Sequence, residues 1–477
     1  MTIMTNALSG ALASQMALSA TSQNIANLQT KGYTRQAALL SAVGADAGGK
    51  AVGNGVEVSS LLRFSDGYKS QQMWRAAAET GQYSQTQPYL TQLERVMGDD
   101  TASLSVAVDG FFASLNAVAG DSVTSTPLRQ QVLTAAGLLA QRFNSINNVY
   151  NAQRQSLTQQ RGAIVDSANA NITKIAALNA RIMQGNAVGA PVSGLIDARD
   201  LAIDELSGQM ALEISEQPNG LRDIALKTGQ ALVIGSVAGK LTATGGVGAQ
   251  SFKLDFASTT FTLDAAKLGG QMGGLSTYEQ ETLLPLQQAV ATIANKLATQ
   301  VNAQLAKGFA MDANATAGKP LFVLPDALPA GTPRIVAGFD TLATTTLLSV
   351  AEGFTTTDLA FSSDRIPGTQ GDAGNLKELV GINNQPILAP FLGSVMLSDA
   401  DTQLVGKLGV LSQQNQAALA TAQTMRTHAV EDWQATSGVN QDEEAINLVE
   451  YQNMYQANMK VMSVANSLFD ATLAMMG

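Results

Sequence analysis

Apolar residues recur every seven positions at both ends of the chain. The N-terminal rows contain Met4, Ala11, Leu18 and Ile25, with Ala7, Ser14, Thr21 and Leu28 between them. The C-terminal rows contain Leu448, Tyr455, Met462, Phe469 and Met476, with Tyr451, Asn458, Ala465 and Thr472 between them. Alternating steps of three and four residues are typical of a coiled-coil seam. The pattern predicts two amphipathic helices, over residues 4–28 and 441–476, that pair with each other.

The C-terminal helix has a second apolar row at Met454, Val461, Leu468 and Met475. An apolar face of that width needs several neighbours to bury it, so we expect the paired ends to bind copies of themselves as well. The predicted assembly interface comprises Met4, Leu8, Ala11, Leu18, Ile25, Leu28, Leu448, Tyr455, Val461, Met462, Leu468 and Phe469.

Helical periodicity dominates the rest of the chain. The predicted helices cover 66–97 (interrupted near Pro88), 104–117, 128–182, 195–211, 277–307 and 398–434. The run over 128–182 follows strict spacing of four and three apart from a polar slip at Gln160. If it is continuous, it is about 80 Å long at roughly 1.5 Å per residue. A helix of that length predicts a rod-shaped bundle.

The period changes to two in the middle of the chain. Short alternating strands separated by Pro-Asn-Gly, Thr-Gly and Gly-Gly turns predict a small antiparallel β domain over roughly 212–270. Residues 309–375, with weak strand patches at RIVAGF and DLAFSS, are assigned to the same domain and its loops. Asn54-Gly55 and the alternation that follows predict a hairpin arm within 37–63.

The predicted fold is therefore mainly α with a β insert. A terminal coiled coil is formed by 1–36 and 437–477, and a helical-bundle rod by 37–211, 276–308 and 376–436. A β-rich outer domain, formed by 212–275 and 309–375, is nested in the middle and lies farthest from the paired ends.

Composition narrows the function. Charged residues make up 14% of the chain, against roughly 25% in typical proteins, so extensive subunit contact would desolvate little charge. A net charge of −10 and no basic cluster argue against nucleic acid as a partner. No cysteine is present, which excludes disulfides and thiolate metal sites. The N-terminus lacks a charged region before its apolar stretch, so no cleaved secretory signal is expected, and no apolar run is long enough to span a membrane.

Candidate chemistry is sparse. His428, the single histidine, has no readable serine–acid partnership, and an exposed or structural role is expected. Three carboxylates at 442–444 are explained more simply by their favourable interaction with the positive end of a helix dipole than by a metal site. The glycine pairs near 245 and 269 lack the strand–turn–helix context of a phosphate loop. Trp74 and Trp433 are interpreted as packing residues. No catalytic, cofactor-binding or metal site is predicted, and the chain is not expected to be an enzyme.

The two ends resemble the terminal signatures of the bacterial flagellar axial proteins. The resemblance rests on ALSGALASQMALSATSQNIANLQTKGYTRQ at 7–36 and SGVNQDEEAINLVEYQNMYQANMKVMSVANSLFDATL at 437–473, with support from GNGVEVSSLLRFSD at 53–66 and GLIDARDLAIDEL at 194–206. The ending Gly-Tyr-Thr-Arg-Gln is similar to that of the hook–filament junction family, whereas hook and rod proteins usually end in a Gly-Phe-Lys-like sequence. The signature residues are Asn24, Ile25, Ala26, Asn27, Gly32, Tyr33, Arg35, Gln36, Gly438, Val439, Asn440, Asp442, Glu443, Glu444, Tyr455, Gln456, Ala457 and Asn458. Gln441 departs from the leucine common there, and the chain is shorter than many members.

The resemblance implies a structural protein outside the cell, in the flagellum. The terminal helices would line a central channel, with the bundle as the next shell and the β domain outside. It also implies a homo-oligomeric ring of about eleven subunits, between the hook protein on one side and a second junction protein on the other. Export through the flagellar type III apparatus, aided by a cytosolic chaperone at the C-terminal region, is implied too. Other readings are another axial component (hook or distal rod), a secreted adhesin that uses the β insert, or a secreted hydrolase.

Overall fold

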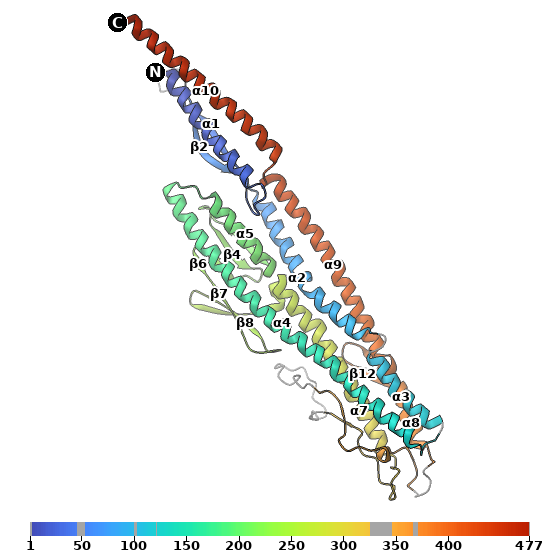
Figure 1. Ribbon diagram of the computed structural model, residues 1–477. Coiled ribbons are helices and arrows are strands. Elements are labelled where there is room, and N and C mark those ends of the chain that lie inside the picture. Colours follow the sequence, from blue (N-terminus) through green and yellow to red (C-terminus); the bar gives the residue numbers. More distant parts are fainter. Residues whose placement is uncertain are drawn as a thin grey trace.

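The computed structural model describes residues 2–44, 53–99, 103–120, 122–324, 346–365 and 371–476. The molecule is elongated, and both termini lie at one end of it (Figure 1). Its α-helices are α1 (Thr2–Ala26), α2 (Gly67–Met97), α3 (Leu104–Gly120), α4 (Thr126–Val188), α5 (Ser193–Gln209), α6 (Gly270–Tyr278), α7 (Leu284–Leu305), α8 (Gly374–Gly381), α9 (Ala400–Ser437) and α10 (Gln441–Met476). Within these ranges, the structure contains no helix with the length and apolar character needed to span a bilayer.

The helix α4 forms the axis of the rod. It is continuous over 63 residues, or about 95 Å at 1.5 Å per residue, which confirms the predicted long helix and extends it at both ends. The residues at the predicted spacing are buried, among them Val132, Leu139, Phe143 and Leu157. Gly189, at a φ of 69°, ends the helix in the left-handed conformation that favours glycine.

The predicted interruption of the second helix near Pro88 is wrong, because α2 passes through this proline. Pro88 has no N–H for the Ser84 carbonyl of the preceding turn. In the same turn, the Tyr83 carbonyl accepts from the Thr86 hydroxyl (3.1 Å) and from Asn415 Nδ2 of α9 (3.1 Å). The turn that the proline weakens is thus bound to a distant helix, which helps to keep α2 continuous.

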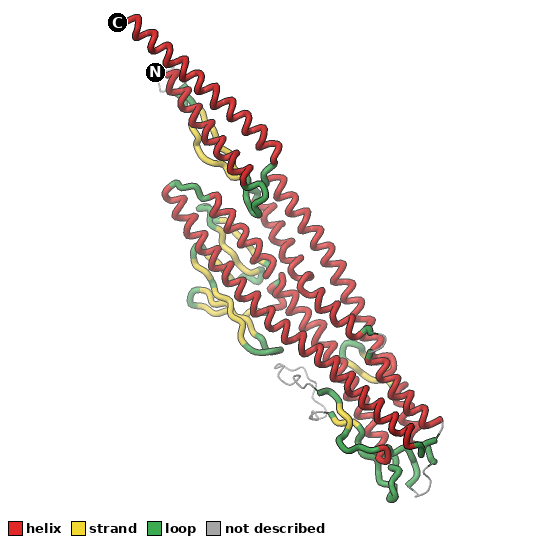
Figure 2. Tube along the Cα trace, in the orientation of Figure 1, coloured by secondary structure: helices red, strands yellow, loops and turns green. Residues whose placement is uncertain are grey.

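The predicted β insert is confirmed over 212–263, but it does not lie farthest from the paired ends as predicted, because α3 and α8 form the opposite end of the molecule (Figure 1). The strands β3 (Leu212–Glu216), β4 (Arg222–Leu226), β5 (Ala231–Ile234) and β6 (Val237–Ala238) form one antiparallel sheet, and β7 (Lys240–Thr244), β8 (Ser251–Phe256) and β9 (Thr259–Leu263) form another. Both sheets lie along one side of the rod (Figure 2). Asn179 Nδ2 donates to the Arg222 carbonyl (2.9 Å) and Asn169 Nδ2 to the Leu241 carbonyl (2.8 Å), so the insert packs on the C-terminal half of α4.

The segment after α7 packs elsewhere. Asn302 Nδ2 donates to the Phe322 carbonyl (2.7 Å) and Asn144 Nδ2 to the Leu348 carbonyl (2.8 Å), which places this segment on α7 and on the N-terminal half of α4. The two parts that the sequence analysis grouped as one β-rich domain therefore lie against different halves of α4. The strands here are short: β10 (Phe322–Val323), β11 (Ser349–Val350), β12 (Pro386–Ala389) and β13 (Gly393–Met396). The patch DLAFSS contributes an isolated bridge at Ser362, and RIVAGF lies outside the described residues.

At the end with both termini, α1 and α10 lie side by side, and the antiparallel hairpin of β1 (Gln36–Ala42) and β2 (Val56–Arg63) covers α1 (Figure 1). The predicted hairpin arm is thus confirmed, with Gly55 at a φ of 97°. Residues 45–52 between the strands are outside the described ranges. We call α1, the hairpin and α10 the terminal unit.

Candidate functional site: the terminal unit and its joint with the rod

The two terminal helices meet through small residues on α1. Its buried positions are Ala7, Ala11, Ala13, Ser14, Ala17, Ala20, Thr21 and Asn24. The half-buried positions of α10 follow the predicted rows and include Leu448, Tyr451, Tyr455, Asn458, Met462 and Ala465. At Gly10 the helices are so close that a Cβ atom would lie 2.6 Å from Asn458 Oδ1. The heptad pattern thus describes a real seam within one molecule.

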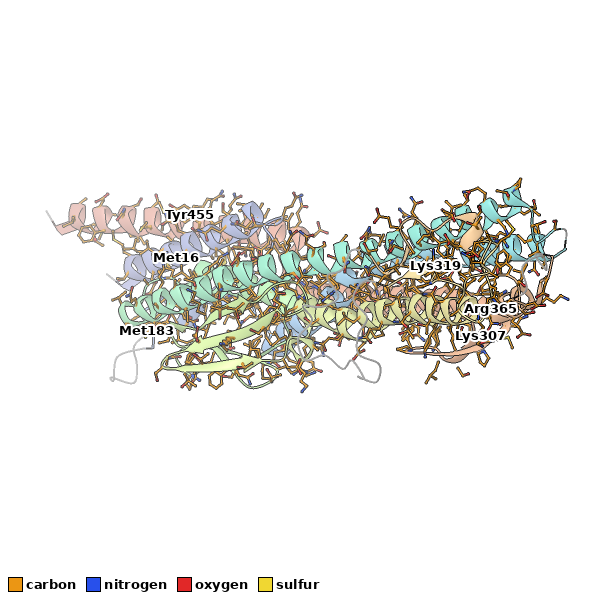
Figure 3. The ribbon with its side chains drawn as sticks, turned by 90° about the horizontal axis from the view of Figure 1, so that it is seen from below. Met16, Met183, Lys307, Lys319, Arg365 and Tyr455 are labelled. Carbon is orange, nitrogen blue, oxygen red and sulfur yellow. The ribbon has the colours of Figure 1, made fainter. Side chains whose placement is uncertain are left out.

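The larger apolar residues of the predicted interface face away from this seam. Ala11 is buried and Leu18, Leu448, Tyr455 and Met462 are half-buried, whereas Met4, Leu8, Ile25, Leu28, Val461, Leu468 and Phe469 are exposed. Leu12 and Met16 of α1, which the sequence analysis did not assign to the interface, extend the row of Met4 and Leu8. Figure 3 shows Met16 on α1 and Tyr455 on α10. We call Met4, Leu8, Leu12, Met16, Met454, Val461 and Leu468 the outer apolar surface.

Asn24 fixes the turn that follows α1. Its Oδ1 accepts from the Gln36 N–H (3.0 Å) and the Tyr33 hydroxyl (2.9 Å), and its Nδ2 donates to the Gln36 carbonyl (2.8 Å). The side chain is buried, so these bonds replace the water that it loses. Gly32 lies within this turn at a φ of 80°, a left-handed conformation that favours glycine.

Arg35 joins the turn to the start of α10. Its N–H donates to the Ser437 carbonyl (2.8 Å), its guanidinium contacts the Glu443 carboxylate, and it lies 4.3 Å from the centre of the Phe64 ring. Asn440 caps α10, because its Oδ1 accepts from the N–H groups of Asp442 (3.0 Å) and Glu443 (3.4 Å). The carboxylates in the first turn of α10 therefore lie at the positive end of the helix dipole, which stabilises them. Glu443 in addition binds Arg35 across the joint.

Acidic residues of α5 hold the terminal unit against the rod. Asp197 accepts from Arg63 Nε (2.9 Å) and from the Thr34 N–H (3.2 Å), and Arg63 also reaches Asp200 (3.1 Å). Burial raises the pKa of the Asp197 carboxyl, whereas the charge of Arg63 and the bonds from Thr34 act in the opposite direction. One arginine of the hairpin thus bridges two carboxylates of the rod.

The same helix face continues the charge network. Asp200 pairs with Arg222 (2.5 Å) and Arg199 (3.2 Å), and Asp204 pairs with Arg426 of α9 (2.7 Å). The stretch that contains these carboxylates was predicted as a helix and supported the family resemblance, but it was not predicted to form a joint. Their spacing on one face of a predicted helix was a usable signal, but nothing in the sequence identified the arginines that meet them.

A cavity of about 470 Å³ lies beside this network. The turn after α1, α2, α5 and α9 enclose it, and both tryptophans of the chain, Trp74 and Trp433, line it. Trp74 is only 3% exposed, and Arg222 lies 5.1 Å from the centre of its ring. The tryptophans therefore pack at the joint, as expected of packing residues.

The single histidine lies on the surface, away from the buried carboxylates of the joint. His428 is on α9 with its side chain 70% exposed, and its Nδ1 lies 3.4 Å from the Glu431 carboxylate. Among the residues that the structure describes, no group of three or more histidines and carboxylates is placed to hold a metal ion. The arrangement of the site is that of a structural joint with an apolar surface beside it.

Known proteins show the same organisation. Residues 90–322 match the family described as flagellar hook-associated protein FlgK helical domain, and 434–475 match the C-terminal domain of the flagellar basal body rod proteins FlgEFG. Flagellar hook-associated protein 1 of Escherichia coli K12 is 27% identical over 550 positions that cover 99% of each chain, and that of Bacillus subtilis 168 is 24% identical over 98% of this chain and 96% of the relative. The structure of the flagellar hook junction protein FlgK from Burkholderia pseudomallei, 18% identical, shares the fold with a TM-score of 0.66, covering 76% of this chain and 99% of that one. The chain is therefore similar to flagellar hook-associated protein 1 over nearly its whole length, and its fold is that of a flagellar hook junction protein.

Proposed function

We propose that this protein is a structural subunit of the bacterial flagellum, located where the hook meets the filament. The family is one of structural proteins and not of enzymes. The observation that supports assembly most directly is the outer apolar surface, of which four residues lie on α1, a helix without a charged residue, and three lie on α10. Such a surface can be buried between subunits without the cost of desolvating charge.

The outer apolar surface is large enough to drive assembly. Complete burial of one large apolar side chain is worth roughly 1.5–3 kcal/mol. Its seven residues are each about half exposed, so their burial between subunits would supply about 7 kcal/mol per subunit before the entropic cost of association. The signature residues Ile25, Gln456 and Ala457 are exposed as well, and we assign them to the same contacts.

The finer organisation is proposed by analogy with the family. The subunits would form a ring of about eleven in the flagellar lattice, with the hook protein on one side and a second junction protein on the other. They would reach that place outside the cell through the flagellar type III apparatus, without a cleaved signal peptide. A cytosolic chaperone would cover the C-terminal region, where α10 continues past α1 and exposes Leu468 and Phe469 (Figure 1).

The test is complementation of a strain from which the gene has been deleted. We expect hooks without filaments in that strain, and full filaments once the wild-type protein is restored. Leu468→Asp should fail to restore filaments, because it places a charge on the outer apolar surface. Val188→Asp is the matched control: Val188 is 78% exposed at the end of α4, outside the terminal unit, and the variant should restore filaments.

Electron microscopy of purified hook–basal bodies and labelled antibody then locate the protein. A single spot per flagellum supports a junction, whereas a short labelled segment would indicate a hook protein. Removal of residues 441–477 should leave a folded rod by circular dichroism that no longer enters the junction. Full filaments on hooks of the deletion strain would contradict the proposal.

A further inference from the structure

Two irregular helical turns lie side by side in the middle of the rod. In α2, Pro88 leaves one intrahelical hydrogen bond unmade. The path from α6 to α7 is interrupted by a π-helical turn at Glu279–Leu283. Tyr89 and Tyr278, which are adjacent to these two turns, stack with ring centres 5.6 Å apart. Prolines and π-turns are the two commonest origins of bends in helices, and here one of each occurs at the same level.

A cavity lies between these two turns and α9, beside a direct contact of α2 with α9. It measures about 280 Å³, and its lining includes Thr86 and Leu90 on either side of the proline, and Tyr278 and Thr282 of the neighbouring helix. Asn415 of α9 completes the wall and bonds to the Thr86 hydroxyl (2.8 Å). Side chains around such a cavity can shift with less repacking than a close-packed core would require.

The core at this level is polar and charged. Glu279 is buried between two arginines of α4, with Arg161 Nη2 at 2.6 Å and Arg154 Nε at 3.7 Å from its carboxylate oxygens. Tyr278 donates to Gln153 Oε1 (2.7 Å) in the same layer. A buried charge cluster adds little net stability but requires specific partners, so it keeps the helices in register while neighbouring packing changes.

We propose that the rod bends at this level, which we define as residues 86–90 of α2, 278–283 between α6 and α7, and 153–161 of α4. The proline and the π-turn allow two helices to change direction, and the cavity supplies the space into which they move. The helices α4 and α9 pass the level without a break, so they act as the elastic connection between the two halves. This property belongs to the free subunit and does not depend on its place in the flagellum.

Pulsed electron–electron double resonance, which measures the distance between two spin labels, tests the bend on the purified full chain. Because the chain has no cysteine, two introduced cysteines carry the only spin labels. Tyr68→Cys with Val106→Cys spans the level, from the start of α2 to α3. Tyr68→Cys with Met183→Cys is the control pair within the upper half, and all three positions are exposed. We expect the spanning distance distribution to be at least about twofold broader than the control distribution.

Pro88→Ala restores the missing N–H and should narrow the spanning distribution towards the width of the control. Pro127→Ala is the matched substitution, because Pro127 stands in the first turn of α4, where a missing N–H costs nothing. It should leave the distribution unchanged. The proposal is overturned if the wild-type spanning distribution is as narrow as the control. It is equally overturned if Pro88→Ala has no effect on a broad one. Both measurements use the monomer, so their failure would leave the proposed junction role untouched.

Discussion

Gly10 sets the distance between the two terminal helices, and Gly10→Ala should separate them. A Cβ atom at this position would lie 2.6 Å from Asn458 Oδ1 and 2.8 Å from its Cγ. The whole amide of Asn458 would have to move, which breaks its bond from Nδ2 to the Met454 carbonyl (2.9 Å). Overpacking costs roughly 1–3 kcal/mol and the lost hydrogen bond about 1 kcal/mol, against a gain of about 1 kcal/mol in helix propensity.

The net expectation is a loss of about 2 kcal/mol in the local stability of the α1–α10 pair, or up to about thirtyfold in the opening equilibrium. Hydrogen–deuterium exchange of the amides of α1 and α10 measures this directly. Gly162→Ala in α4 is the matched control, because a Cβ atom there would have no neighbour within 4 Å. That variant should gain up to about 1 kcal/mol.

Asn458→Ala in the Gly10→Ala background should recover most of the lost protection, since it removes the clashing amide. A double-mutant cycle between the two positions isolates that coupling. The reasoning is refuted if Gly10→Ala slows amide exchange in the terminal helices as Gly162→Ala slows it in α4. That result would mean that the space between the two helices accommodates a methyl group.

Three further outcomes are expected. Asn24→Ala should speed exchange across residues 27–36, because it removes three hydrogen bonds of about 1 kcal/mol each. Arg63→Ala should destabilise the protein to urea by about 3–5 kcal/mol, since it leaves two partly buried carboxylates without their shared partner, whereas Lys267→Ala, which breaks an exposed pair, should change stability by less than about 1 kcal/mol. Burial raises the pKa of Tyr150 above its ordinary value. The contribution of this side chain to stability is therefore complete below pH 10 and is lost as the pH rises further. Tyr150→Phe should reduce the alkaline decline of the unfolding free energy by about 1.4 kcal/mol per pH unit.

The periodicity of apolar residues predicted the helices and the faces that they turn inward, because both depend on residues close together in the sequence. The spacing of α4 identified its buried positions, and the rows of α10 identified its half-buried positions as far as Ala465, because a helix repeats its face every three or four residues.

The features that the sequence did not reveal depend on partners far away in the chain. Pro88 was taken as a break because its local effect is to end a helix, whereas Asn415 helps to hold the helix together from α9. The joint depends on Arg63 meeting Asp197 across 134 positions. No local pattern encodes such a pairing, so the acidic face of α5 was visible but its function was not.

The joint and the outer apolar surface would make different contributions to the proposed assembly. Apolar burial is non-directional, so on a loosely tethered terminal unit it would favour association in many orientations. The pairs of Arg63 with Asp197 and Asp200 fix the unit against the rod, because charge-assisted bonds of a guanidinium require specific geometry. Arg63→Ala should therefore still associate, as light scattering would detect, but form irregular aggregates instead of tubular arrays in electron micrographs. Regular arrays from this variant would mean that the apolar contacts alone set the orientation of the subunits.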